Sequence, residues 1–162
     1  MQAIKLLRGM HAETKVQFKI ILGTDDPQLA NQAWQALQPV LKLHEEIEDR
    51  FVYQPLQEET LPGTPLGDWA VQHDADVELV EQLILALGDL APGAPEWRMC
   101  LAEVMDALSK HVMDEEGQIF GRIEQVWDAA RLDKAGAEMQ KLVDTHASSQ
   151  MTTKPKAARR RS

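Results

Sequence analysis

Four segments of this chain repeat apolar residues every three or four positions, and glycine and proline lie in the connections between them. This spacing matches the 3.6-residue turn of an α-helix, so each segment predicts an amphipathic helix with one apolar face. The predicted helices span about 3–22, 27–53, 68–87 and 95–130, with a bend at Pro39 in the second. Their similar lengths and short connections predict an all-α, up-down-up-down four-helix bundle with one common core.

The remainder of the chain predicts a short extra helix and a tail. Apolar periodicity resumes at Asp133, continues to about Thr145, and is absent after Ala147. We therefore expect a bundle domain at 1–146, including a short C-terminal helix, and a disordered basic tail at 147–162. Strong helix formers dominate the composition and strand formers are few, which favours the all-helical interpretation.

Charge and cysteine content limit the possible partners and compartments. The net charge is −9, although five of the 17 Lys and Arg residues lie in the last nine positions. An acidic folded domain repels phosphate backbones, so we expect it to bind no nucleic acid. No apolar run is long enough to span a membrane, no signal peptide is evident, and Cys100 has no second cysteine to pair with. These features predict a cytoplasmic protein without a membrane span.

Each predicted apolar face carries a histidine near its middle, and on two of the faces a glutamate follows four positions later. A histidine and a carboxylate at this spacing project from the same side of a helix, one turn apart. If the four faces share one core, these side chains must meet there. The six candidate site residues are His11, His44, Glu48, His73, His111 and Glu115.

Buried carboxylates require a positive partner, and no lysine or arginine lies near these residues on the same faces. A buried, unpaired charge costs several kcal/mol, so the group is protonated or binds a cation. Two metal ions supply the missing charge, and each glutamate is able to bridge both. Imidazole and carboxylate ligands suit iron, manganese or zinc, while the single cysteine excludes iron–sulfur and thiolate sites. The pattern predicts a dinuclear metal centre in the bundle core.

Three readings of this pattern remain open. The first is a metalloprotein that binds or turns over small molecules. The second is a non-catalytic iron- or oxygen-responsive sensor, or an iron-handling module, that acts through an unidentified protein partner. The third is a structural bundle without metal, since a lone core histidine is commonly a satisfied packing residue. Chance placement of a histidine on all four faces, twice with a glutamate one turn on, is the weakest explanation.

The segments HEEIEDRFVYQPL (44–56) and KHVMDEEGQIF (110–120), with LLRGMH and WAVQHDADVELV, resemble the hemerythrin-like, HHE cation-binding family. The resemblance covers about residues 4–130. It implies a non-haem centre of two iron ions held by the six residues named above, with both glutamates bridging and an oxo or hydroxo bridge. Manganese or zinc are possible substitutes. The ligands it implies are dioxygen, peroxide or nitric oxide.

The sequence departs from the oxygen-carrying members of that family at one position. Those members carry a second histidine one turn after the histidine of the third helix, where this chain has Val77. Fewer protein ligands leave more positions open for exogenous ones, which favours activation or turnover over reversible carriage. Catalase-like peroxide turnover is therefore a possibility, and whether the protein is an enzyme stays open.

Residues beside the six candidates are assigned plainer roles. The acidic neighbours of the candidates in sequence are expected to point off the apolar faces into solvent, with support of a metal ligand as the alternative; they are Glu45, Glu46, Asp114 and Glu116. Tyr53 lies past the second-helix pair, where packing is expected and a hydrogen-bonding or radical role is the alternative. Cys100 is about three turns from His111, too far to be a ligand, and His146 is expected to be exposed.

Overall fold

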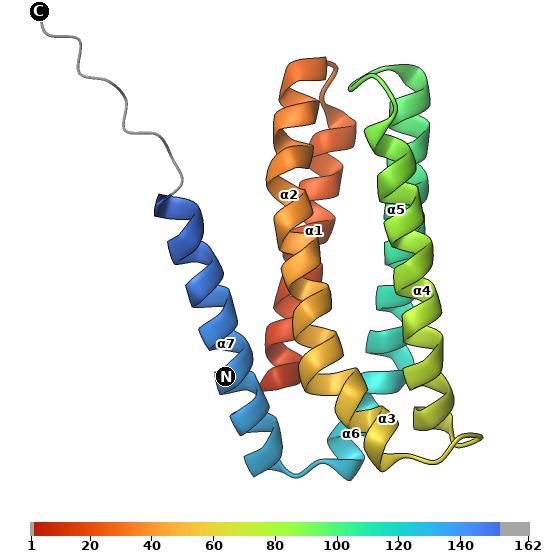
Figure 1. The fold of residues 1–162 in the computed structure, drawn as a ribbon, viewed down its shortest axis with the longest axis vertical. Coiled ribbons are helices and arrows are strands. Elements are labelled where there is room, and N and C mark those ends of the chain that lie inside the picture. Colours follow the sequence, from red (N-terminus) through yellow and green to blue (C-terminus); the bar gives the residue numbers. More distant parts are fainter. Residues whose placement is uncertain (1, 153–162) are drawn as a thin grey trace, which may run out of the picture.

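Four long helices lie side by side in the computed structural model of the protein, which describes residues 2–152. They are α1 (Ala3–Gly23), α2 (Pro27–Glu48), α4 (Pro65–Gly88) and α5 (Pro95–Asp114). The colour order in Figure 1 shows that successive long helices run in opposite directions. No strand occurs within residues 2–152, so the prediction of an all-helical bundle is confirmed. None of the helices in this range has the length and apolarity needed to cross a bilayer.

Proline and short polar side chains determine where the long helices begin. The Asp26 carboxylate accepts a hydrogen bond from the Gln28 amide at 2.8 Å, and Pro27 opens α2. Thr64 caps α4 in the same way through the amide of Gly67, at 3.3 Å. These caps satisfy amides that have no partner within the helix, and proline is tolerated because its missing N–H needs none.

The two connections at the upper end of the bundle in Figure 1 are joined to each other. Arg98 donates hydrogen bonds to the Thr24 carbonyl at 2.7 Å and to the Gly93 carbonyl at 3.1 Å. Gly93 has φ +79°, and a Cβ placed on it would lie 2.5 Å from the Cβ of Pro27. Only glycine fits this contact, which sets the spacing between the two helix pairs.

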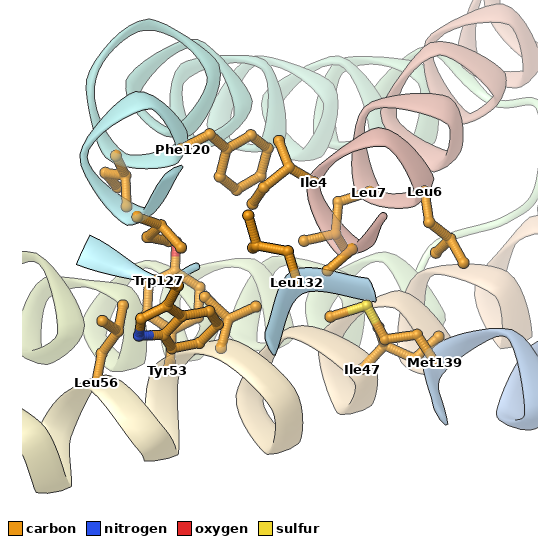
Figure 2. Close-up of a cluster of buried hydrophobic side chains, with 14 of the residues drawn as sticks. Ile4, Leu6, Leu7, Ile47, Tyr53, Leu56, Phe120, Trp127, Leu132 and Met139 are labelled. Atoms are coloured by element: carbon orange, nitrogen blue, oxygen red, sulfur yellow. The ribbon is translucent and has the colours of Figure 1, made fainter. Parts of the chain in front are cut away.

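The core consists of two apolar clusters at opposite ends of the bundle. The lower cluster, shown in Figure 2, includes Ile4, Leu7, Ile47, Tyr53 and Phe120. The upper cluster includes Phe18, Trp34, Leu87, Trp97 and Leu101. Each such buried side chain contributes roughly 1.5–3 kcal/mol to folding. Along the chain, each candidate histidine lies between residues of the two clusters, so the clusters enclose the polar layer from both ends.

The second and fourth predicted helices each contain a π-helical turn, and the second continues beyond its predicted end at about residue 53 into a segment that the sequence does not predict as helical. The first π turn (Asp49–Tyr53) separates α2 from α3 (Gln54–Glu59), and the second (Glu115–Ile119) separates α5 from α6 (Phe120–Val126). The amide of Gln54 donates to the Asp49 carbonyl, and the amide of Phe120 donates to the Glu115 carbonyl, which is the i to i+5 bond of a π turn. Helix α2 itself continues through Pro39.

The C-terminal helix α7 (Ala129–Thr152) is longer than the sequence predicts. It packs against the outside of α1 and α2 (Figure 1) and buries Leu132 and Met139 in the lower cluster. Arg131 fixes its start by pairing with Glu59 of α3 and lying over the Trp127 ring, 3.9 Å from its centroid. The prediction that the chain is disordered directly after Ala147 is therefore wrong. The tail beyond Thr152 lies outside the described residues, and the division into domains stays a prediction.

Candidate metal centre

All six candidate residues converge in the polar layer between the two apolar clusters. Helix α1 contributes His11, α2 contributes His44 and Glu48, α4 contributes His73, and His111 and Glu115 stand at the junction of α5 with the second π turn. Five of the six are buried, with Glu115 completely inaccessible, and the side chain of His44 is 12% exposed. The one-turn spacing within each pair places each histidine beside its glutamate, as the sequence predicts.

One half of the cluster is formed by His11 and His44. Their Nε2 atoms lie 3.0 Å apart. The Oε1 atom of Glu48 lies 3.4 Å from the Nε2 of His11 and 3.1 Å from that of His44. The Oε2 atom of Glu115 completes this half, 3.3 Å from the Nε2 of His11. His11, His44 and Glu48 form one group whose ligand atoms could hold an ion, and Oε2 of Glu115 adjoins this group at the ring of His11.

The other half is formed by His73 and His111. The Nε2 atoms of both rings lie 3.9 Å from the second oxygen of Glu48, Oε2. The Nε2 of His111 lies 3.3 Å from Oε1 of Glu115. Each glutamate thus directs one oxygen to each half of the cluster, and Glu48 belongs to both groups of residues whose atoms could hold one ion. Glu48 is therefore placed to contact an ion in either half of the cluster.

Several buried polar atoms in this layer have no hydrogen-bond partner. They are Nδ1 of His44, Oε1 of Glu48, both ring nitrogens of His73 and Oε2 of Glu115. Buried polar groups are nearly always satisfied, and an unpaired buried group costs about 1–3 kcal/mol. The glutamates also form no ion pair with a lysine or arginine among residues 2–149. Donor type, orientation and missing partners therefore fit a pair of cations.

The negative charges of the two glutamates favour protonation of the neighbouring histidines. Burial lowers the pKa of His11, but the close approach and negative charge of Glu115 and Glu48 outweigh burial and raise that pKa to about 10. The same balance raises the pKa of His111 to about 11. Burial raises the pKa of Glu48, but the neighbouring histidines hold it well below its usual range. Both glutamates consequently remain anionic, and the site keeps its affinity for positive charge.

The comparison with known families agrees with this geometry. The sequence model described as the hemerythrin HHE cation binding domain matches residues 2–123. The chain belongs to this family. No curated protein matches the chain significantly.

A solved structure shares the fold of this hemerythrin-like chain. It is the crystal structure of a hemerythrin HHE cation binding domain-containing protein from Mycobacterium kansasii, with a TM-score of 0.77 and 21% sequence identity. The match covers 98% of this chain and 96% of that chain. At this identity the likeness establishes the common fold and leaves the activity open.

Two carboxylates hold the outer nitrogens of histidines in this hemerythrin-like site. Nδ1 of His11 lies 2.9 Å from Oε1 of Glu116, and Nδ1 of His111 lies 3.4 Å from Oδ2 of Asp76. Such carboxylate contacts fix the tautomer and orientation of a ligating imidazole. Glu116 is exposed, as the sequence predicts, and its contact with His11 favours the alternative role of supporting a metal ligand. Asp76 carries no signal in the sequence, since its contact crosses from α4 to α5.

Tyr53 is part of the cluster rather than only a packing residue. Its hydroxyl donates a hydrogen bond to Oε1 of Glu115, and its ring stacks on His73 with centroids 3.7 Å apart. Burial, reinforced by the charges of Glu115 and Glu48, raises its pKa well above the usual range, so the hydroxyl stays a neutral donor. Of the two roles considered for Tyr53, the structure favours hydrogen bonding.

The first π turn accounts for the position of Tyr53 on the same side of the chain as Glu48. In an α-helix, five residues make about 1.4 turns, so Tyr53 would point away from Glu48. A π turn closes at i+5 and returns Tyr53 to the same side. Phe120 follows Glu115 at the same distance and lies parallel to the His11 ring, with centroids 5.8 Å apart. The repeat in the sequence is thus His-x3-Glu-x4-aromatic, a signal that would have identified both rings.

The remaining candidates lie apart from the cluster. Cys100 is partly buried in the upper cluster, with Sγ 3.6 Å from the Leu83 carbonyl. His146 lies on α7 and is partly exposed. Glu46 is exposed, and Asp114 pairs with Lys110 at 3.1 Å.

Proposed function

We propose that this chain is a non-haem di-iron protein that binds or turns over dioxygen, peroxide or nitric oxide. The proposed metal ligands are the four histidines and two glutamates of the cluster. The observation that carries the proposal is the placement of Glu48 and Glu115, each with one oxygen directed to each half. Membership of a cation-binding family and the unsatisfied buried atoms of the same layer agree with it.

Iron bound in both halves would supply a redox-active, Lewis-acidic pair of ions. The chain offers each ion two imidazole nitrogens and two carboxylate oxygens, which leaves positions free for a small exogenous ligand. Tyr53 orients Glu115 through its hydrogen bond, and Glu116 and Asp76 orient His11 and His111. The apolar clusters above and below exclude water from the ends of the layer, which strengthens charge interactions inside it.

Metal analysis of the full chain purified from iron-supplemented cells tests the proposal. We expect close to two iron ions per chain and the near-ultraviolet charge-transfer absorption of a bridged iron pair. The spectrum of the reduced protein is then recorded before and after addition of dioxygen, peroxide and nitric oxide. Iron at background level, with no binding of manganese or zinc either, would refute the proposed centre.

A pair of neighbouring glutamates on α2 provides a matched test of the ligands. Glu48→Gln removes a carboxylate that serves both halves, so we expect at most one iron per chain. Glu46→Gln removes the same charge from the exposed surface two residues earlier and should retain two. Full iron content in Glu48→Gln would contradict the assignment of Glu48 as a bridging ligand.

The alternative function is a non-catalytic, iron- or oxygen-responsive module that acts through a protein partner. It predicts two bound iron ions without peroxide consumption. Oxygen evolution from peroxide by the iron-loaded chain, lost in Glu48→Gln and kept in Glu46→Gln, favours turnover. Iron binding with a ligand-dependent spectrum and no turnover favours the module.

A further inference from the structure

An open cavity lies beside the metal centre, between α2 and α4. Its volume is about 240 Å³, and its walls are formed by Glu45, Asp49, His73, Asp74, Val77, Glu78 and Glu81. A water molecule occupies about 30 Å³ of liquid, so the cavity has room for one ion with most of its hydration shell. It opens to solvent at the half of the centre formed by His73 and His111.

The lining is strongly acidic on both sides. Glu45 and Asp49 are one turn apart on α2 and the first π turn, and they face Asp74, Glu78 and Glu81 of α4 across the cavity. Their hydrogen-bond partners are neutral amides, such as Gln57 for Asp74. Among the described residues, none of these five carboxylates forms an ion pair with lysine or arginine, although the charge of Lys42 acts on Glu45 from the same helix.

A buried histidine whose ring nitrogens have no hydrogen-bond partner lines this acidic cavity. His73 is 3% exposed, and neither ring nitrogen has a hydrogen-bond partner. Nδ1 lies 3.8 Å from Asp74 of the cavity wall, and Nε2 lies 3.9 Å from Glu48 of the centre. The ring therefore connects the acidic cavity to the metal centre, and the unsatisfied nitrogens indicate a cation as the ligand of this position.

We propose that this cavity is the port through which divalent metal cations enter the centre, held in transit by the carboxylates of α2 and α4 and delivered to His73. The proposal rests on the metal-binding function proposed above. Carboxylate oxygens replace part of the hydration shell, so the ion loses water gradually rather than all at once. The acidic lining concentrates cations at the opening and repels anions, an effect that low-dielectric walls enhance. Val77 lines the same cavity without offering a ligand, so it does not retain the ion.

The rate of Co²⁺ uptake by the metal-free full chain tests the port, because Co²⁺ absorbs visible light more strongly once histidine replaces its water ligands. In E78Q/E81Q we expect uptake about tenfold slower at low ionic strength, with two ions per chain still bound at the end. Release into a saturating chelator should slow by the same factor, because a port lowers the barrier in both directions. The wild-type uptake rate should also fall more steeply with added salt than the variant rate.

The matched control is E96Q/E103Q, which removes the same charge from exposed positions of α5. Both double variants weaken the general attraction of the acidic chain for cations equally, because each removes two negative charges. We therefore expect the uptake and release rates of E96Q/E103Q to stay within about twofold of the wild-type rates. Equal rates in both double variants would overturn the port. Unchanged uptake combined with weaker binding and faster release would also overturn it, because that result describes a charge effect on the bound ions alone.

Two further outcomes are distinguishable. A wild-type chain that takes up no Co²⁺ refutes the metal centre itself, whereas normal uptake with no difference between the variants refutes only the port. If E78Q/E81Q loses helicity, the single variant E81Q and the salt dependence of wild-type uptake carry the same test. A wild-type rate independent of salt would then overturn the proposal.

Discussion

Replacing Tyr53 by phenylalanine removes one hydroxyl and keeps the ring that stacks on His73. Tyr53 and Glu115 are both fully buried, so no solvent reaches the carboxylate to replace the lost donor. A hydrogen bond to a charged group contributes about 1.5–3 kcal/mol. We therefore expect the free energy of unfolding of the metal-free protein at pH 7 to fall by about 2 kcal/mol. For a chain of this size that corresponds to a melting temperature lower by about 4–8 °C.

Urea unfolding followed by circular dichroism measures this change, and a chelator keeps both proteins free of metal. Tyr53→Leu serves as the comparison because it removes the stacked ring as well, and should cost about 1 kcal/mol more from the lost ring contact alone. In the metal-loaded protein, loss of the bond that orients Glu115 should weaken metal affinity about 10- to 100-fold. An unfolding free energy of Tyr53→Phe within 0.5 kcal/mol of wild type would refute the reasoning.

Two other predictions concern the fold. Gly93→Ala should destabilise the chain more than Gly63→Ala. Both positions have positive φ, which costs a non-glycine residue about 1–2 kcal/mol, but only at Gly93 does the new Cβ also meet Pro27. Equal urea midpoints of the two variants would show that the loop at Gly93 shifts freely. The hydrogen bond from Arg131 lowers the pKa of Glu59, so this pair stabilises the protein above the usual carboxyl pKa and the gain is lost as the pH falls through the lowered value. Because the pair is partly exposed, Glu59→Gln should cost only about 0.5 kcal/mol at pH 7 and nothing measurable at pH 2, and a cost independent of pH would contradict the assignment.

Most of the bundle and the six cluster residues could be predicted because the relevant information is local. A three- or four-residue apolar period places side chains on one helical face wherever the helix lies. Caps such as Asp26 with Pro27 likewise act within one turn. Four histidines on four apolar faces then leave few arrangements in which the faces meet without bringing the rings together.

The features that the sequence did not predict all concern places where the backbone depends on distant residues. A π turn replaces the α-helical bond with a wider one, and its stabilisation comes from what the redirected side chains contact. Tyr53 gains Glu115 and His73 in this way, and Glu116 gains His11. None of these partners lies within a turn of the residue it contacts. The length of α7 has a similar origin, since its first half is held against the bundle by buried Leu132 and Met139.

The sequence by itself determined that the chain is helical, approximately where the four bundle helices lie, and which six polar side chains of the cluster enter the core. These properties follow from side-chain period and capping, which act over a few residues. Tertiary structure decided how the two glutamates divide their oxygens between the halves, which carboxylates hold the histidines, and that an acidic cavity ends at His73. These features depend on the distance and rotation between packed helices, which are properties of the assembled core and not of any single segment.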